Sequence, residues 1–206
     1  MGYQNHEGVK WTDLMILIYI HGATATAESF NYLREHIGGP DLAIEYDSAH
    51  GFKENLEEMA RVVANYDRIF LIAHSLGGIY SLHLANLFPS KILGAVTIST
   101  PYGGAESADY VKYFLPFSRL LRDIGPNSWP MRTVKTLKIL HPWTNIVTTR
   151  GSSPWMLAPN DGVVSIDSMS DRADMNLIHL EYNHYEIMLS PKVAEIIKNK
   201  IKDIHE

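Results

Sequence analysis

Cysteine is absent from the 206 residues of this chain. Disulfides, thiolate metal sites and catalysis by a thiol nucleophile are therefore excluded. The absence is compatible with a reducing and with an oxidising compartment, so it leaves the location open.

Long hydrophobic runs are also missing. The longest apolar run, Leu14–Ile20, has seven residues, whereas a membrane-spanning helix needs about 20. The run lacks the basic flank and the small-residue cleavage site of a signal peptide. We therefore expect no transmembrane segment and, by default, a cytoplasmic location; a leader already removed would leave no trace.

Charge of one sign is not concentrated anywhere in the chain. Its 18 Lys and Arg against 23 Asp and Glu give a net charge of −5, and no basic run is long enough to predict a nucleic-acid surface. The 10 histidines show no metal-ligand spacing, and no glycine-rich phosphate loop follows an expected strand. We expect no metal, no other cofactor and no nucleic-acid partner.

The length and a hydrophobic content of 46% predict one globular domain. Buried strands that alternate with helices predict an α/β fold, in which a mostly parallel sheet is covered by helices on both faces. The stretch 137–140 remains unassigned. Strands are expected at 14–20, 42–46, 67–73, 91–99, 145–149 and 175–181, and helices at 27–37, 53–65, after residue 75 and at 191–204.

The segment 73–78, Ala-His-Ser-Leu-Gly-Gly, lies between a β-branched apolar run and a segment with helical spacing. Strand, tight turn and helix in this order are typical of a nucleophile elbow, a strained turn that exposes a serine hydroxyl above the sheet. Ala73 and Gly77 provide the small residues that such a turn requires. We predict that Ser75 is a nucleophile and that the amide of Leu76 points at the reacting carbonyl. A turn that merely ends a strand is the alternative.

Two further reactive side chains, a carboxylate and an imidazole, also follow expected strands. In a parallel sheet, reactive residues gather at the carboxyl ends of the strands. Ser75, Asp161 and His184 each come after a strand, so a nucleophile, an acid and an imidazole arrive at one edge. Serine, aspartate and histidine in this chain order predict a catalytic triad.

The predicted acid and the predicted base of this triad have rivals. Asp161 precedes a glycine, an ordinary turn dipeptide. Asp167 and Asp171 are alternative acids, but both lie in the following segment. His179 is an alternative base, but it lies inside the last strand, whereas His184 follows that strand. We therefore favour Asp161 and His184.

Together these motifs resemble those of the α/β-hydrolase superfamily, in particular compact bacterial lipases and esterases whose elbow also begins with alanine. The resemblance spans nearly the whole chain, and it implies an α/β-hydrolase fold and serine-hydrolase chemistry. The segments that carry it are His21-Gly22, the elbow at 73–78, Phe88-Pro89-Ser90-Lys91, Ser99-Thr100-Pro101-Tyr102-Gly103-Gly104-Ala105, Asp161-Gly162-Val163-Val164-Ser165 and His184.

The resemblance also implies roles. Ser75 attacks an acyl carbonyl, His184 takes its proton and later returns it to the leaving group, and Asp161 holds the tautomer of His184.

An oxyanion hole needs two backbone amides, which we assign to Leu76 and, by resemblance, to Ala23. Thr24 lies close enough in the sequence for its hydroxyl to assist. His21 is expected to brace this loop, and His74 to be structural and to point away from Ser75.

The segment 101–130 contains no expected strand and lies where this fold inserts lids, so a short cap is expected at about 101–133. Its density of aromatic residues favours an apolar acyl or aryl pocket. Packing of the cap against the body explains the same residues, and both interpretations remain open. Tyr32, Trp143 and Trp155 are further candidates for the mouth of the site. The predicted substrate-binding residues are Thr24, Tyr102, Tyr110, Phe114, Phe117 and Leu121.

Two classes of function follow from this pattern. The favoured one is hydrolysis of carboxylic esters, of small molecules or lipids, through an acyl-enzyme on Ser75. A thioesterase, an amidase or an acyltransferase uses the same triad, and the sequence does not separate them. The second class is a ligand-binding protein that keeps the fold without turnover, although binding alone requires none of the three predicted triad residues. The sequence does not indicate an oligomeric state.

Overall fold

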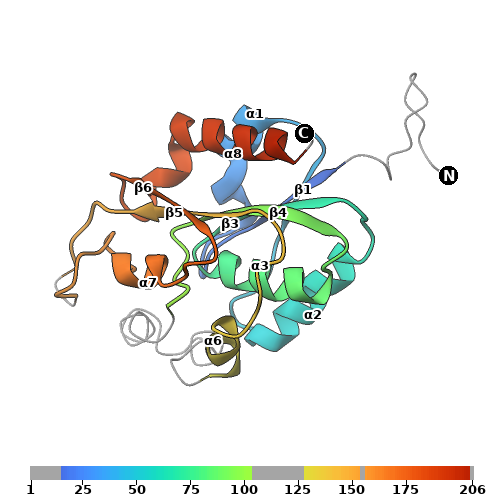
Figure 1. Cartoon of the computed structure of the whole chain (residues 1–206), viewed down its shortest axis with the longest axis horizontal. Helices are drawn as coiled ribbons and strands as arrows, with labels where there is room; N and C mark the ends of the chain where they lie inside the picture. The colour runs from blue at the N-terminus through green and yellow to red at the C-terminus, as the bar shows by residue number, and fades with distance from the viewer. Residues whose placement is uncertain (1–14, 104–127, 154–155, 205–206) are drawn as a thin grey trace.

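A computed structural model describes residues 15–103, 128–153 and 156–204 of the chain. Six strands form one parallel sheet with the order β2-β1-β3-β4-β5-β6. The sheet lies between two layers of helices (Figure 1). The strands are β1 (Ile16–Ile20), β2 (Asp41–Ile44), β3 (Ile69–His74), β4 (Ile92–Ile98), β5 (Trp143–Thr148) and β6 (Asn176–Leu180).

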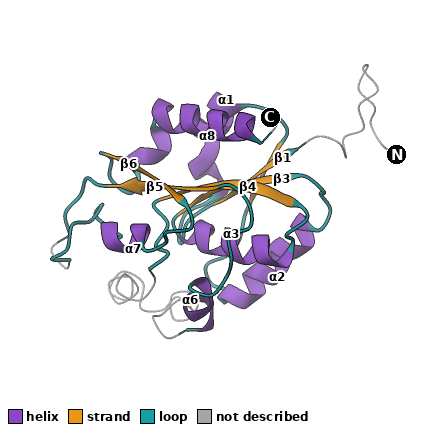
Figure 2. Ribbon diagram, in the orientation of Figure 1, coloured by secondary structure: helices purple, strands orange, loops and turns teal. Residues whose placement is uncertain are grey.

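Helices cover both faces of the sheet (Figure 2). On one face lie α1 (Asn31–Ile37) and α8 (Pro191–Asp203), which pack against each other. On the other face lie α2 (Phe52–Val63) and α3 (Leu76–Leu87), with the short helices α6 (Trp129–Val134) and α7 (Ile166–Ser170). Two 3₁₀ turns, η2 (Ala27–Phe30) and η3 (Glu186–Leu189), precede α1 and α8.

The core is divided by the sheet because side chains alternate across a strand. In β1, Ile18 and Ile20 pack into the cluster on the α2 and α3 face, while Leu17 and Tyr19 pack into the cluster on the α1 and α8 face. A strand buried on both faces is apolar throughout, which is why these strands appear in the sequence as continuous hydrophobic runs.

The predicted fold class is confirmed, with shifts at element boundaries. Strand β5 begins at Trp143, directly after Pro142, because proline has no amide to donate to a sheet ladder. The carbonyl of Pro142 still accepts the amide of Ala95, at 3.0 Å. The unassigned stretch 137–140 is neither helix nor strand. The short elements α6, α7 and η3 were not predicted.

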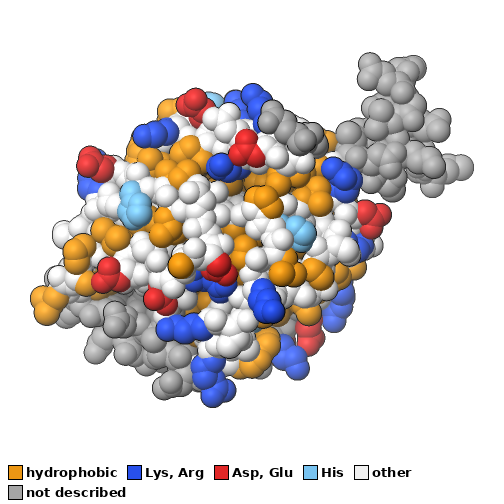
Figure 3. Space-filling model, viewed as in Figure 1, with side chains coloured by type: hydrophobic (Ala, Val, Ile, Leu, Met, Phe, Trp, Pro, Cys, Tyr) orange, Lys and Arg blue, Asp and Glu red, His pale blue; other side chains and the backbone are white. Residues whose placement is uncertain are grey.

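The surface agrees with the even charge distribution of the sequence. On the face shown in Figure 3, Lys and Arg side chains are interspersed with Asp and Glu. Across the described ranges, every helix is too short or too polar to span a lipid bilayer.

Candidate active site

The segment around Ser75 is a strained turn between β3 and α3. Ser75 has φ 52° and ψ −121°, a conformation that L-residues rarely adopt. A Cβ on Gly77 would lie 2.0 Å from the carbonyl oxygen of Ile20, and one on Gly78 would lie 2.0 Å from the Thr100 hydroxyl. The two glycines therefore let α3 start directly against the strands, which is what a nucleophile elbow requires.

The carboxylate of Asp161 is held by its own turn. Its Oδ1 accepts hydrogen bonds from the amides of Val163, at 3.0 Å, and Val164, at 2.8 Å. Gly162 has φ 100°, a left-handed conformation that glycine adopts without strain. The dipeptide that looks like an ordinary turn in the sequence thus also orients the acid.

His184 is the partner of this acid. Its Nδ1 lies 2.7 Å from Asp161 Oδ2, and its amide donates to the Asp161 carbonyl at 3.1 Å. A carboxylate only accepts hydrogen bonds, so Nδ1 carries the proton and Nε2 of the neutral ring carries a lone pair. That is the tautomer that a general base needs.

Asp161 is ionised at neutral pH. Burial raises the pKa of its carboxyl, but the hydrogen bond and charge of His184, together with the Thr148 hydroxyl and the Val164 amide, lower it by more. The pKa of Asp161 therefore lies below its usual range. An anion is thus in place beneath the His184 ring.

His74 connects the elbow to His184. Its Nε2 donates to the carbonyl oxygen of His184 at 2.9 Å, and the two ring centroids are 4.7 Å apart. Burial and the charge that His184 can carry lower the pKa of His74 to about 3, so its ring is neutral. Because His74 is bonded to Ser75 in the chain, this contact brings the elbow and the His184 loop to the same edge of the sheet.

The loop after β1 lies directly against Ser75. A Cβ on Gly22 would lie 3.1 Å from Ser75 Cβ, so the next residue, Ala23, follows at the edge of the elbow. Leu76 is the first residue of α3, and an amide at that position has no acceptor within its own helix. Thr24 is exposed and has φ 60°.

His21 braces this loop from below, as expected. It is fully buried and stacks on Tyr46, with ring centroids 4.1 Å apart and planes 3° apart. Its Nδ1 donates to the Gly22 carbonyl at 2.8 Å, and burial lowers the pKa of the ring.

The rival residues lie elsewhere. Asp167 is exposed on α7, and Asp171 is exposed and pairs with Lys135 at 3.7 Å. His179 is an exposed residue inside β6.

Two predicted candidates for the substrate site belong to the core. Tyr102 is fully buried, and its hydroxyl donates to Thr97 Oγ1 at 3.1 Å and accepts from the indole of Trp143 at 2.9 Å. The ring of Tyr102 is packed in the core, and its hydroxyl is hydrogen-bonded there. We predicted that Tyr102 binds substrate, and the structure corrects this to a residue of the core. Trp143 begins β5, at the opposite end from the mouth of the site. The predicted residues Tyr110, Phe114, Phe117, Leu121 and Trp155 lie outside the described residues, as does most of the predicted cap.

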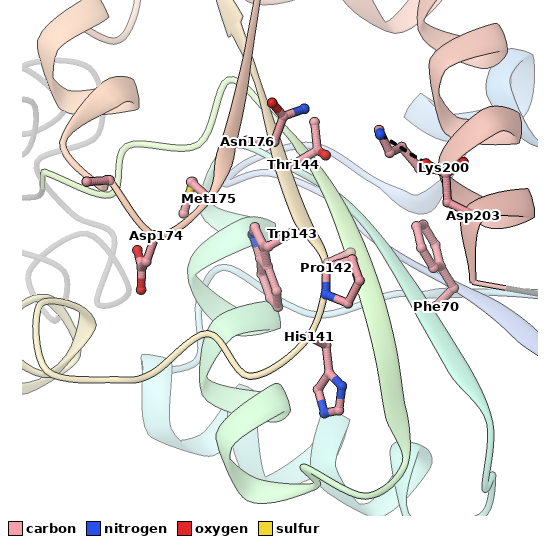
Figure 4. Close-up of a pocket in the computed structure, with 12 residues that line it drawn as sticks. Phe70, His141, Pro142, Trp143, Thr144, Asp174, Met175, Asn176, Lys200 and Asp203 are labelled. Carbon is pink, nitrogen blue, oxygen red and sulfur yellow. Dashed lines mark hydrogen bonds and ion pairs between the residues drawn. The ribbon is translucent and has the colours of Figure 1, made fainter. Parts of the chain in front are cut away.

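A pocket of about 410 Å³ lies at the amino ends of the strands (Figure 4). It is lined by Trp143 of β5, Asn176 of β6 and the Lys200–Asp203 ion pair of α8, among others. Ser75, by contrast, follows the carboxyl end of its strand. This pocket is therefore separate from the candidate active site.

Two hydroxyl residues of the site were missed in the sequence. Thr148 donates to Asp161 Oδ2 at 2.5 Å, and Ser99 lies 2.9 Å from the Thr148 hydroxyl. Both stand at the carboxyl ends of expected strands, and that position is the signal that could have identified them. Threonine is common in strands. In the sequence, Thr148 therefore reads as an ordinary β-branched strand residue, and nothing indicates that its hydroxyl donates to Asp161.

Comparisons with known proteins agree with this architecture. The sequence profile of the alpha/beta hydrolase family matches residues 17–189. The chain is similar to a structure from the study of the metagenome-derived lipolytic enzymes LipS and LipT, with 14% identity, a TM-score of 0.69 and 93% of each chain covered.

Two further solved structures show how widely this fold is shared. The monoacylglycerol lipase of Paleococcus ferrophilus has 15% identity and a TM-score of 0.65, with 90% of this chain and 91% of that chain covered. A loop variant of the haloalkane dehalogenase DbeA of Bradyrhizobium elkanii has 10% identity and a TM-score of 0.68, with 94% and 90% covered. At such identities the likeness shows the fold, and the reaction has to be argued from the site.

Proposed function

The chain belongs to the alpha/beta hydrolase family, and we propose that it is a serine hydrolase that cleaves carboxylic esters through an acyl-enzyme on Ser75. The observation that carries the proposal is the 2.7 Å bond between His184 Nδ1 and Asp161 Oδ2, in a loop that His74, the residue before the strained Ser75, holds by its carbonyl. A buried acid and imidazole in this tautomer prepare a neutral base for a neighbouring hydroxyl.

The reaction would proceed in two halves. Ser75 Oγ attacks the ester carbonyl carbon while His184 Nε2 takes the hydroxyl proton, and the carbonyl oxygen becomes an oxyanion. The tetrahedral intermediate collapses, the bond to the alcohol oxygen breaks, and His184 gives its proton to the departing alcohol. Water then attacks the acyl-enzyme with the same base, which releases the carboxylic acid and restores Ser75.

Three other groups would stabilise the charges that appear in these steps. The amides of Leu76 and Ala23 are the proposed donors to the oxyanion. Asp161 is ionised, so it stabilises the positive charge that His184 acquires when it takes the proton.

The proposal also concerns which kind of ester the protein cleaves. The lipolytic enzymes and the monoacylglycerol lipase that share the fold make lipid esters the first substrates to test. Thioesters and amides react through the same intermediates, so a substrate panel decides among them. A ligand-binding protein without turnover is the outcome if no substrate reacts.

The test combines a probe with a matched pair of variants. A fluorophosphonate should label Ser75, as mass spectrometry of the modified peptide can establish, and the Ser75→Ala variant should lose both labelling and hydrolysis of p-nitrophenyl acetate and octanoate. Ser90→Ala, a change at an exposed serine, is the control and should keep both. Hydrolysis that persists in Ser75→Ala would refute the proposal.

A further inference from the structure

A continuous line of buried hydrogen bonds extends from His184 into the sheet. His184 Nδ1 lies 2.7 Å from Asp161 Oδ2, Thr148 Oγ1 lies 2.5 Å from the same oxygen, and Ser99 Oγ lies 2.9 Å from Thr148 Oγ1. The exposed fractions are 3% for His184, 1% for Asp161 and 0% for both hydroxyl residues. These groups are therefore shielded from bulk water.

The direction of the bonds follows from the number of hydrogens. A threonine hydroxyl has one hydrogen, and an ionised carboxylate can only accept. Thr148 therefore donates to Asp161, and its oxygen accepts the hydrogen of Ser99. The sulfur of Met169, 3.5 Å from Thr148 Oγ1, is a much weaker acceptor than the carboxylate and does not compete.

The backbone fixes both hydroxyl groups. Thr148 is the last residue of β5, and Ser99 follows the last residue of the neighbouring β4. Ser99 has φ 53°, a conformation that glycine would adopt without strain, and its amide donates to the Ile146 carbonyl at 2.8 Å. Glycine would fit this backbone conformation more easily, but it has no hydroxyl. The serine at this position provides the hydroxyl that contacts Thr148.

The position of Thr148 matters for the charge on Asp161. The amides of Val163 and Val164 occupy Oδ1, so among the described residues the partners of Oδ2 are His184 and Thr148. When the ring takes a proton, the Nδ1 proton is drawn toward Oδ2. A donor on Oδ2 makes that oxygen a weaker base and keeps the proton on the imidazole.

We propose that Thr148 is a positioning residue for the acid–base pair, and that Ser99 orients the Thr148 hydroxyl. The inference rests on the proposed function, and it assigns to the two residues the task of keeping Asp161 ionised and aimed at His184. Within the part of the chain that the structure describes, the ionisable groups that act on Asp161 are His184 itself and, from the end of β3, His74.

The decisive variants each differ from the wild type by one non-hydrogen atom. Thr148→Val keeps the shape and removes the hydroxyl, Thr148→Ser keeps the hydroxyl, and Ser99→Ala removes the donor to Thr148. Thr149→Val is the matched control, because the hydroxyl of Thr149 donates to the Leu180 carbonyl at 3.2 Å and not to the acid.

Thr148→Val should lower kcat for an acyl ester about tenfold or more, the usual effect of a lost hydrogen bond to a charged group, with KM within about twofold. The acidic midpoint of the kcat/KM profile, which belongs to the Asp161–His184 pair as a unit, should move to higher pH, because the carboxylate becomes easier to protonate. Thr148→Ser should have a kcat within about threefold of the wild type and a wild-type acidic midpoint. Ser99→Ala should have values between those of Thr148→Val and the wild type, and Thr149→Val should match the wild type.

A second readout needs no substrate. The proton shared by His184 and Asp161 gives a downfield proton NMR signal, which should shift in Thr148→Val and in Ser99→Ala but not in Thr149→Val. A melting curve would reveal whether Thr148→Val folds. If it does not, the same NMR signal is compared in Ser99→Ala, where it should shift, and in Thr148→Ser, which keeps the hydroxyl and should keep the wild-type signal.

The outcomes separate this inference from the proposed function. If Ser75→Ala stays active, the proposed function fails. If Ser75→Ala is inactive while Thr148→Val keeps the wild-type kcat, acidic midpoint and NMR signal, only the inference about Thr148 is overturned. Equal losses in Thr148→Val and Thr149→Val would also overturn it, since they would indicate general damage around the end of β5.

Discussion

The imidazole of His74 donates a hydrogen bond from Nε2 to the carbonyl oxygen of His184, at 2.9 Å. The residue before the proposed nucleophile thus holds the backbone of the proposed base. Two bonds to Asp161, one from the His184 amide and one from its Nδ1, fix the same residue from the other side. The position of the proposed base relative to the elbow therefore depends on a neutral side chain that takes no proton in the proposed reaction.

Replacement of His74 tests this dependence. A glutamine side chain can place an amide donor where Nε2 lies, whereas leucine cannot. His74→Gln should keep kcat for an acyl ester within about fivefold of the wild type, and His74→Leu should lose about tenfold or more. The measurement is kcat and KM for both variants, with melting temperatures as the control for folding. Equal activity in the two variants would show that the hydrogen bond does not position His184.

The same histidine should make the fold sensitive to acid. Burial lowers the pKa of His74 to about 3, and it also lowers the pKa of His21 and of His83. A group with a lowered pKa in the fold takes up its proton on unfolding, so its contribution to stability is present above about pH 6.5 and is lost as the pH falls toward the folded value. Each such histidine should steepen the decline by up to about 1.4 kcal/mol per pH unit.

Urea unfolding followed by tryptophan fluorescence at several values between pH 7.5 and pH 4.5 measures this slope. The free energy of unfolding should fall with pH in the wild type, and the fall should be shallower in His74→Gln, which cannot take up the proton. His179→Gln, at an exposed position of β6, is the control for losing a histidine as such. Identical slopes in the wild type and in His74→Gln would contradict the predicted uptake of a proton by His74.

The sheet and the elbow could be predicted because their signals are local. A buried strand shows as a short apolar run, and Gly77 stands two residues after Ser75 in the sequence itself. The contact of Ser99 with Thr148 joins residues 49 positions apart and depends on β4 lying beside β5. No local pattern contains that pairing.

The misplacement of Tyr102 has a similar cause. The sequence shows an aromatic residue at the start of a segment rich in aromatics, and this favours a cap. In the structure the chain turns inward after β4, so that Tyr102 meets the indole of Trp143 inside the core. The direction in which a loop turns is set by the elements around it, not by the composition of the loop.

The elbow glycines offer a prediction about stability. Gly77→Ala would place a Cβ 2.0 Å from the Ile20 carbonyl oxygen, and backbone cannot give way without moving α3 from β1. We expect a loss on the order of 4 kcal/mol or more, or no folded protein. Gly38→Ala is the comparison, because its Cβ would have open space while φ 71° strains the backbone, at a cost of about 1–3 kcal/mol. Denaturant unfolding of both variants measures the difference, and a Gly77→Ala variant as stable as Gly38→Ala would count against the close approach of helix and strand.

The last prediction concerns the acid. Asp161→Asn keeps an oxygen that can accept the amides of Val163 and Val164, so the turn should persist. Its amide group, however, donates toward His184 Nδ1 and forces the proton of the neutral ring onto Nε2, where it blocks uptake of the Ser75 proton. We expect kcat for an acyl ester to fall on the order of a thousandfold or more with little change in melting temperature. Asp167→Asn, an isosteric change at the exposed rival on α7, is the matched control and should stay within about twofold of the wild type. If Asp167→Asn were the inactive variant, the acid of this site would lie on α7, and the bond between His184 and Asp161 would be structural.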